Sequence, residues 1–438
     1  MVRGSAIVGS AAWGSTSLVG CADHEASTLR FWAMGREGEV ASELLKGFHQ
    51  ENPGLRVRVE QLPWSAAHEK VLTAFAGDAT PDVAQMGNTW LPEMTALGAL
   101  EPLDAWLART PSIDRSDQFE GIWATNRMDE HTVGLPWYVD TRLLFVRQDL
   151  LASVGFGEVP QDWDGWVRCM AALKAGPVAT PLLLPTNEFE PLLALALQQD
   201  GELLREGGRF GNFSGPGFQK ALRFYYSLFE RGYAPSITHN QVANVWQEFG
   251  RGTFAFYISG PWNIGEFKRR LPPGLQSAWT TAPLPGPRGP GASIAGGSSL
   301  VMFKRSRHKP EAWRLMEYLS RPQVQQTFYQ LTGNLPARRS AWQRPMPSTG
   351  GGAPHDAAPL AQDPRARAFA LQLERARATP AVAEWERIAQ EMQLAAARGL
   401  HERRGVAQTA QGLDAQVDRL LEKRRWMLAR AQRGAEGT

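Results

Sequence analysis

The sequence contains very little cysteine. Only Cys21 and Cys169 occur in 438 residues, and the eight histidines are scattered along the chain. Two cysteines without a histidine cluster do not match the ligand set of a zinc site, so we expect no metal. A disulfide between them is not expected either, because each has a separate explanation. Cys169 falls in a predicted helix, where a buried free thiol is the ordinary interpretation, and Cys21 ends a leader-like segment.

An excess of charge of one sign is also missing, and so are long apolar runs. Lys and Arg total 47 against 44 Asp and Glu, a formal net charge of +3. The two signs are interspersed, which leaves no electrostatic case for nucleic acid. The Arg-rich stretch 401–433 is interrupted by acids and is interpreted as a solvated helix face. After the leader, no apolar run approaches the ~20 residues that a membrane-spanning helix requires.

Motifs for chemistry are absent as well. The sequence has no P-loop, no G-x-S-x-G and no H-E-x-x-H string. Residues 250–255 fit G-x-G-x-x-A, but they precede a predicted strand, whereas a dinucleotide loop follows a strand and opens a helix. We therefore predict that the protein is not an enzyme and needs no cofactor.

Tryptophan, by contrast, is abundant, with 16 Trp against 7 Tyr. Many of the tryptophans stand beside Pro, Gly, Asn or Asp, where loops are expected. A hydrophobic core uses only a few indoles, so this distribution favours stacking of aromatic rings on a ligand.

The first 21 residues resemble a secretory signal that ends in a lipidation motif. A positive charge at Arg3 precedes a short, mostly small and apolar segment, residues 5–17, which is typical of a signal peptide. Leu18-Val19-Gly20-Cys21 resembles a lipobox, in which Cys21 takes the lipid; the alternative is a chance cysteine after a weak signal. We predict a protein on the periplasmic or extracytoplasmic face, anchored to the membrane through Cys21. Stable anchoring then needs more than one acyl chain.

Strands and helices alternate at the start of the mature chain. Residues 29–34 are strand-like, and the segment 35–38 breaks the strand. Apolar residues at helical spacing follow, up to Asn52-Pro53-Gly54. Residues 55–60 alternate as a half-buried strand, a helix is expected over 66–76, and a strand over 81–86. This order predicts a parallel α/β sheet, whose ligands lie beyond the carboxyl ends of its strands.

The rest of the chain continues the α/β pattern. Two strands, 131–136 and 142–146, are expected on either side of Trp137-Tyr138-Val139-Asp140, and further strands over 254–258 and 296–303. Residues 163–249 and 309–332 are mainly helical, and helices return after residue 354. The Pro/Gly-rich stretches 283–291 and 345–354 are expected to be loops.

Seven stretches, in one order along nearly all of the mature chain, carry a family resemblance. They are FHQENPG at 48–54, TPDV at 80–83, GLPWY at 134–138 with LFV at 144–146, VPQDWD at 159–164, FGRGTFA at 249–255 with GPW at 260–262, GG at 296–297 with residues 312–319, and GNLPAR at 333–338. Together they resemble the family-1 extracellular solute-binding proteins, the maltose-binding-protein-like group.

This resemblance implies a two-lobed α/β periplasmic-binding-protein fold of type II, in which each lobe is a sheet flanked by helices and a hinge joins the lobes. After the signal peptide (1–21), the N-terminal lobe is expected to comprise 22–139 and 290–335, and the C-terminal lobe 140–289 and 336–438. Ligand lies in the cleft and the lobes close over it. The implied function is the extracytoplasmic binding subunit of a carbohydrate ABC importer, a monomer that delivers its sugar to membrane permease subunits.

Candidate ligand-binding residues are polar or aromatic groups at strand ends, because sugars offer hydroxyls and weakly apolar ring faces. Glu37 follows the first strand; a surface carboxylate at the start of a helix is the alternative interpretation. Asn88 and Trp90 resemble the family's cleft positions after the Pro-Asp-Val strand, where several sugar binders carry Asp in place of Asn88.

Tyr138 and Asp140 resemble a Tyr-x-Asp pattern of trehalose/maltose-type binders; a hinge turn with incidental polarity is the alternative. Trp262, after Gly260-Pro261, resembles the family's stacking tryptophan. The Tyr138/Asp140 pattern favours an α-linked glucose disaccharide such as trehalose or maltose.

The remaining candidates involve backbone and charge. Gly296 and Gly297 allow the backbone to approach a ligand closely, whereas Ser298 departs from relatives that carry an aromatic residue there. Arg377, or alternatively its neighbour Arg375, is a candidate for binding sugar hydroxyls; a charge on a helix surface is the other interpretation of either residue.

Other functions fit parts of the same pattern. The ligand could be another oligosaccharide, a polyol or a glycerol phosphate. A glycoside hydrolase also needs carboxylates among tryptophans, and a receptor-coupling protein for signalling would share the fold and the binding.

Overall fold

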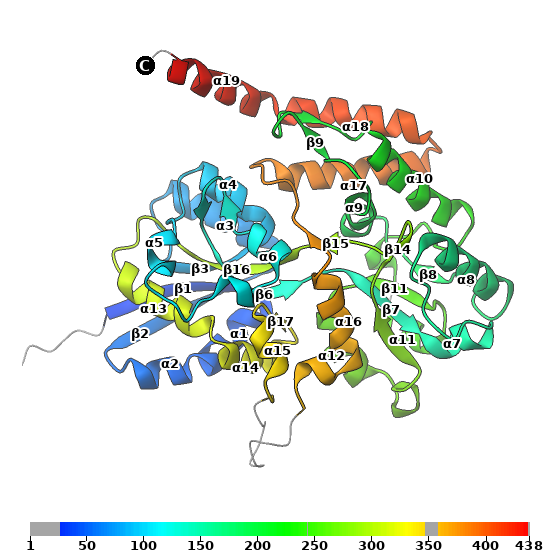
Figure 1. Cartoon of the computed structure of the whole chain (residues 1–438), viewed down its shortest axis with the longest axis horizontal. Helices are drawn as coiled ribbons and strands as arrows, with labels where there is room; N and C mark the ends of the chain where they lie inside the picture. Colours follow the sequence, from blue (N-terminus) through cyan, green and yellow to red (C-terminus); the bar gives the residue numbers. More distant parts are fainter. Residues whose placement is uncertain (1–26, 243, 347–357, 437–438) are drawn as a thin grey trace, which may run out of the picture.

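Two α/β lobes lie side by side in the computed structural model, which describes residues 27–242, 244–346 and 358–436 (Figure 1). The two-lobed fold expected from the sequence is therefore confirmed, while the exact lobe boundaries remain a prediction. The predicted signal peptide and Cys21 lie outside the described residues. In the described parts, no helix combines the length and apolarity needed to cross a membrane.

The first lobe is built on a mixed sheet with the strand order β17-β6-β16-β3-β1-β2. Its first three strands in the sequence run parallel, as the strand–helix alternation predicted, and β16 runs antiparallel to its neighbours β3 and β6. The strands are β1 (Ser27–Met34), β2 (Leu55–Leu62), β3 (Val83–Gly87), β6 (Leu135–Asp140), β16 (Gly296–Met302) and β17 (Leu335–Pro336).

Alternate side chains of β1 enter two separate hydrophobic cores. Phe31 and Ala33 pack on one face of the sheet, and Trp32 and Met34 pack on the other. The first face is covered by α1 (Gly35–Leu44), α2 (Lys46–Glu51), α13 (Lys309–Leu319) and α14 (Pro322–Thr332). The second is covered by α3 (Trp64–Ala76) and α4 (Leu91–Ala96), above the sheet in Figure 1.

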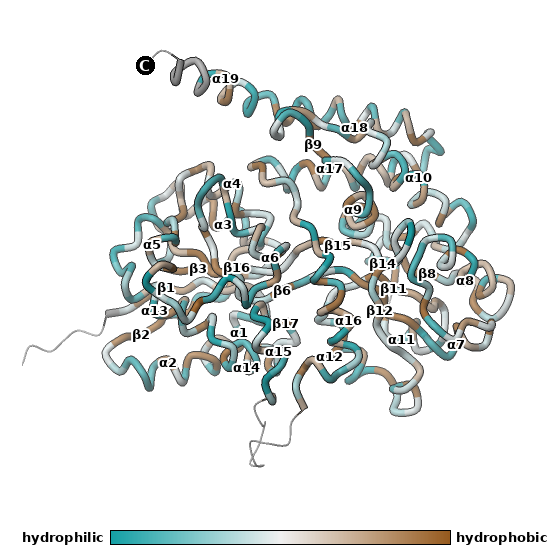
Figure 2. Tube along the Cα trace, in the orientation of Figure 1, coloured by the Kyte–Doolittle hydropathy of each residue, from teal (hydrophilic) through white to brown (hydrophobic). Residues whose placement is uncertain are grey.

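The second lobe contains a four-stranded sheet with the order β12-β7-β11-β8. Its strands are β7 (Leu143–Arg147), β8 (Leu182–Leu183), β11 (Phe256–Ser259) and β12 (Trp279–Ala282). Leu144 and Val146 face one core and Leu143 and Phe145 face the other. The hydrophobic colour of Figure 2 follows these central strands.

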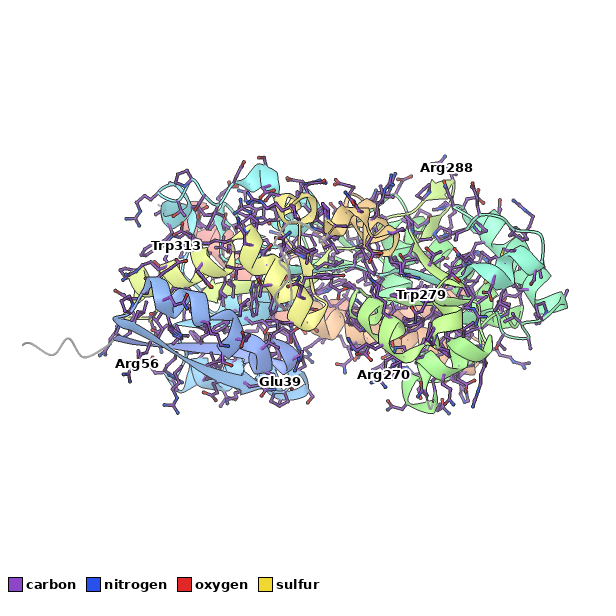
Figure 3. The ribbon with its side chains drawn as sticks, turned by 90° about the horizontal axis from the view of Figure 1, so that it is seen from below. Glu39, Arg56, Arg270, Trp279, Arg288 and Trp313 are labelled. Atoms are coloured by element: carbon purple, nitrogen blue, oxygen red, sulfur yellow. The ribbon has the colours of Figure 1, made fainter. Side chains whose placement is uncertain are left out.

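Helices cover both faces of the second sheet. The helices on the first face are α8 (Trp163–Ala175), α9 (Glu190–Leu197), α10 (Pro216–Glu230), α17 (Trp385–His401) and α18 (Val406–Leu420). Those on the other are α11 (Val245–Arg251), α12 (Trp262–Arg270) and α16 (Pro364–Leu373). In Figure 3, Trp313 marks the core of the first lobe and Trp279 that of the second. Helix α19 (Glu422–Glu436) continues from α18 at the top of Figure 1.

The region around Trp137 differs from the sequence prediction. We expected a strand over 131–136 that ends before residues 137–140, but β6 runs from Leu135 to Asp140 and is bonded to β16 and β17. Trp137 is fully buried in it, because aromatic residues favour a pleated, packed surface. The pairing of β6 with β16 shifts register between Ser298 and Ser299, opposite Pro136, which has no N–H to give to the ladder.

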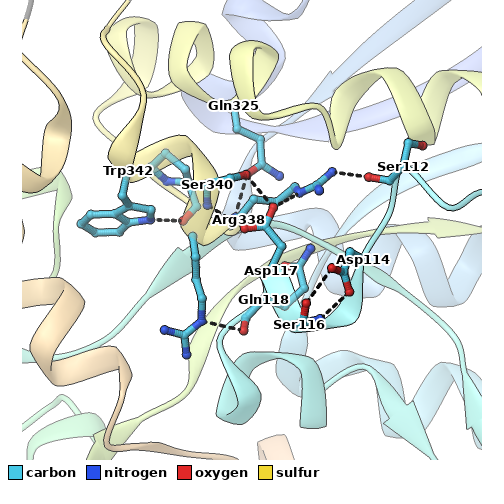
Figure 4. Close-up of polar contacts among 11 residues, drawn as sticks. Ser112, Asp114, Ser116, Asp117, Gln118, Gln325, Arg338, Ser340 and Trp342 are labelled. Carbon is cyan, nitrogen blue, oxygen red and sulfur yellow. Dashed lines mark hydrogen bonds and ion pairs between the residues drawn. The ribbon is translucent and has the colours of Figure 1, made fainter.

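A network of polar contacts centred on Asp117 joins the segment after β17 to the 3-10 helix η2 (Arg115–Asp117) (Figure 4). The Asp117 carboxylate accepts hydrogen bonds from Arg338 Nε, from Ser340 N and from Ser340 Oγ, each at 2.6 Å. Arg338 Nη1 also donates to the carbonyl oxygen of Ser112 at 2.8 Å. Because Asp117 and Arg338 are mostly shielded from water, this ion pair fixes the path of the chain after β17.

The thiol of Cys169 lies in helix α8 and is fully buried and unpaired, as predicted. Burial raises the pKa of the thiol to about 12, so it stays protonated at neutral pH and does not act as a nucleophile. In a chain that begins at Ala22, we expect this sole cysteine to resist a maleimide at pH 8 and to react once urea unfolds the protein. Stoichiometric labelling of the folded protein within minutes would contradict the buried position.

Candidate ligand-binding cleft

A cleft of about 640 Å³ lies between the two sheets. Eight of the nine ligand-binding residues predicted from the sequence line it: Glu37, Asn88, Trp90, Tyr138, Asp140, Trp262, Gly296 and Gly297. They come from the carboxyl ends of β1, β3 and β6, from the start of β16, and from the beginning of α12. The structure therefore brings together residues that are up to 260 positions apart (Glu37 to Gly297: 297 − 37).

Glu37 is a buried carboxylate at the start of α1, not a surface group. Its Oε1 accepts a hydrogen bond from Asn334 Nδ2 at 2.8 Å. Burial and the nearby Glu37 carboxylate raise the pKa of Tyr138 well above its usual value, so the phenol remains protonated and able to donate. These contacts hold Glu37 in one orientation at the edge of the cleft.

The phenol of Tyr138 is fixed by neighbours on β3 and β16. Ser298 Oγ donates to it at 3.1 Å, and Gln85 Nε2 donates at 3.3 Å. Gln85 is itself held by the backbone N–H of Met34, 2.8 Å from its Oε1. Ser298 thus takes part in a buried polar network beneath Tyr138.

The backbone conformation at position 297 requires glycine. Its φ of 122° is a conformation that other residues rarely adopt, and a Cβ there would collide with the carbonyl oxygen of Tyr138. The glycine therefore allows β16 to pair closely with β6 where both strands reach the cleft.

Asn88 lies in the wall of the cleft, but its amide is already engaged within the first lobe. Its Nδ2 donates to Thr125 Oγ1 at 2.8 Å, and its Oδ1 accepts from Ser299 Oγ at 3.3 Å. Asn88 is buried, so its side chain supports the wall more than it offers hydrogen bonds to a ligand.

Two tryptophans form an aromatic edge on the first lobe. Trp64, at the start of α3, meets Trp90 at a ring separation of 5.7 Å and an interplanar angle of 67°. Trp64 remains 39% exposed, so part of its indole is free to contact a ligand.

On the opposite side, Trp262 begins α12 and is 39% exposed. Its indole lies against the backbone of Gly260, where any Cβ would overlap the ring. The guanidinium carbon of Arg142 lies 4.8 Å from the ring centroid.

Arg142 joins the two lobes through charge. Its Nη1 donates to both carboxylate oxygens of Asp140, at 2.9 and 2.8 Å, and its Nη2 donates to Glu190 Oε1 at 2.7 Å. Burial raises the pKa of Asp140, and Arg142 only partly offsets that effect. Burial disfavours the charged guanidinium too, but Asp140 and Glu190 outweigh it and raise the pKa of Arg142.

Arg377 is not brought into the cleft. It lies in β18 (Ala376–Arg377), and its Nη1 donates to the carbonyl oxygen of Leu197 at 2.8 Å and to that of Gln199 at 3.4 Å. The strand ladder between β15 (Ser293–Ile294) and β18 holds the backbone there. From the same region Thr379 reaches the cleft instead, together with Glu386 of α17.

The sequence prediction missed several residues that line the cleft: Trp64, Arg142, Phe189, Glu190, Asn334, Thr379 and Glu386. A signal existed for Arg142, because it follows Asp140 at the same strand end, and for Asn334, because it lies in the GNLPAR motif. Glu190 and Glu386 occupy helix starts that carry no recognisable motif, so only the structure assigns them to the cleft.

Comparisons with known proteins give the family and the fold of the chain. The family model of the bacterial extracellular solute-binding proteins matches residues 34–326. The sugar-binding protein MalE of Xanthomonas citri is 51% identical, with 92% of this chain and 99% of that chain aligned at a TM-score of 0.87. The GacH receptor of Streptomyces glaucescens shares the fold at 24% identity and a TM-score of 0.76, with 91% of this chain and 99% of that chain covered.

A binding protein of Brucella abortus is 27% identical over 315 residues, which cover 69% of this chain and 74% of the relative. The family model spans well over half of the 438 residues, and the 51% identical structure spans nearly all of them. The chain therefore belongs to the bacterial extracellular solute-binding proteins, as a maltose-binding-protein-like sugar binder and not an enzyme.

Proposed function

We propose that the protein is the extracytoplasmic binding subunit of a carbohydrate ABC importer, and that its cleft binds a disaccharide of the trehalose or maltose type. One observation carries the proposal: an exposed indole, Trp262, lies opposite the carboxylate of Glu37 across the same cleft. Flat aromatic rings stack on the apolar faces of sugar rings, and carboxylates accept hydrogen bonds from sugar hydroxyls. The cleft volume of about 640 Å³ falls within the ~300–1,000 Å³ of small-molecule sites.

The charges of the cleft favour a neutral ligand. The described lining residues include four carboxylates, on Glu37, Asp140, Glu190 and Glu386, and two guanidinium groups, on Arg36 and Arg142. Arg142 is neutralised by Asp140 and Glu190, and Arg36 pairs with Glu39. The remaining acids repel an anion, which argues against glycerol phosphate and for an uncharged sugar or polyol.

The two-lobed arrangement gives binding a consequence for transport. A ligand between Glu37 on one lobe and Trp262 on the other contacts both lobes only when they are close together. It therefore stabilises the closed form through these additional contacts. A permease that recognises the closed form would accept the loaded protein and not the empty one.

A thermal-shift screen of the mature protein tests the proposal. Trehalose or maltose at about a hundred times its dissociation constant is expected to stabilise the fold by roughly 2.7 kcal/mol. Glycerol 3-phosphate is expected to give no shift. A shift with another neutral oligosaccharide or polyol only would keep the binding function and replace the substrate, and no shift with any sugar would overturn both.

We also propose that Cys21 carries a lipid anchor. The support is the Leu18-Val19-Gly20-Cys21 sequence at the end of an apolar leader. Cells fed a radiolabelled fatty acid are expected to label the wild-type protein and not a Cys21→Ser variant. Equal labelling of the two would exclude this anchor.

A further inference from the structure

Four groups converge on Arg142, three on its side chain and one on its backbone. Asp140 ends β6, Glu190 begins α9, Trp262 begins α12, and Ser293 in β15 donates its hydroxyl to the backbone carbonyl of Arg142 at 2.7 Å. The guanidinium reaches the first three of these at once. Only 14% of the Arg142 side chain remains exposed, so these contacts are largely shielded from water.

The geometry requires arginine in particular. A planar guanidinium can donate from two separate nitrogens and still present a flat face to an aromatic ring, whereas a lysine ammonium acts as a compact point charge. Here Nη1 serves Asp140, Nη2 serves Glu190, and the guanidinium carbon lies 4.8 Å from the centroid of the Trp262 ring. One side chain therefore sets the positions of two acceptors and of one stacking surface.

Charge balance gives Arg142 a second effect. Removing it would leave Asp140 and Glu190 as partly buried carboxylates that repel each other, and Asp140 would take up a proton at a higher pH than before. Other groups that face this cluster are Glu188, whose pKa is raised by burial and by Glu190, and His239, whose Nδ1 lies 3.2 Å from Glu188. Arg142 lowers the pKa of Glu188, so removing the guanidinium also favours the protonated form of Glu188.

We propose that Arg142 is a positioning residue for the bound carbohydrate: it holds the carboxylates of Asp140 and Glu190 and the indole of Trp262 in one fixed arrangement on the cleft wall. This inference rests on the proposed function, because its effect is measured as sugar affinity. Arg142 acts through its three neighbours, and the sugar itself is bound by them.

The experiment compares calorimetric titrations of the best sugar from the screen into wild type, Arg142→Lys and Arg142→Met, between pH 5 and pH 8. Arg142→Lys keeps the positive charge but loses the two separate donor nitrogens and the flat face of the guanidinium. We expect it to bind the sugar about 10-fold more weakly, with the same dependence of affinity on pH as wild type. Arg142→Met is expected to bind more weakly still, and to lose affinity further as the pH falls and Asp140 becomes protonated.

Arg147→Met is the matched control for general loss of stability. Arg147 is also a buried arginine, paired through Nη2 with Asp149 at 2.8 Å in the second lobe, but it does not line the cleft. We expect this variant to unfold more readily and to keep wild-type affinity. The inference would be overturned if both Arg142 variants bound the sugar with wild-type affinity at every pH. Absence of binding by the wild-type protein would overturn the proposed function instead.

Discussion

Replacing Trp262 with alanine is expected to weaken sugar binding by roughly 30-fold or more, the loss of about 2 kcal/mol that marks a hot-spot residue. The indole is 39% exposed and is held from behind by Arg142 and by the backbone of Gly260. It is therefore a rigid flat surface that need not reorganise when a sugar ring stacks on it. Calorimetric titration of wild type and variant with the same sugar measures the loss directly.

Two further variants separate stacking from other effects. Trp262→Phe keeps a smaller flat ring and is expected to lose only part of the affinity. Trp426→Ala removes an indole that is 57% exposed on α19, outside the cleft, and is expected to bind as wild type does. An unchanged dissociation constant for Trp262→Ala would show that the indole does not form the stacking surface.

The part of the cleft that could be predicted from the sequence consists of short local patterns. Tyr138 and Asp140 lie at the carboxyl end of β6, and Trp262 follows a Gly-Pro pair after β11. Parallel strands end at one edge of a sheet, so residues after them converge whatever their distance in the sequence. Local patterns also predicted β1, β2 and β3 correctly: β2 from its alternation of apolar and charged residues, and β1 and β3 as short runs bounded by breaks.

Pairings between distant segments could not be predicted in this way. The sequence shows Arg142 and Glu190 as two charged residues 48 positions apart, and nothing in either neighbourhood indicates an ion pair. Asn88 was expected to face a ligand, yet Thr125 and Ser299 engage its amide, a contact that depends on how β16 inserts beside β3. Arg377 was expected to bind sugar hydroxyls, but its guanidinium donates to the carbonyl oxygens of Leu197 and Gln199, a pairing of distant segments that no local pattern indicates.

The stability of the fold depends strongly on another such pairing, between Asp117 and Arg338. We expect Asp117→Ala to lower the free energy of unfolding by about 3–5 kcal/mol, the cost of leaving one partner of a buried ion pair without its counter-charge. The substitution also removes the acceptor of two hydrogen bonds from Ser340 (Figure 4). Urea unfolding followed by far-UV circular dichroism measures the loss, provided that the dependence of the unfolding free energy on urea concentration stays unchanged.

Asp114 supplies the matched control, because it lies three residues earlier and caps η2 from an exposed position. Losing a cap costs about 1 kcal/mol, so Asp114→Ala is expected to unfold at nearly the wild-type urea concentration. The double variant Asp117→Ala/Arg338→Met removes both charges, and it should therefore be more stable than Asp117→Ala alone. If Asp117→Ala and Asp114→Ala were equally mild, the Asp117–Arg338 pair would not fix the chain after β17. Asn334, the donor that orients Glu37, directly precedes β17 on the same short segment, so a weakened pair is also expected to lower sugar affinity in the folded protein.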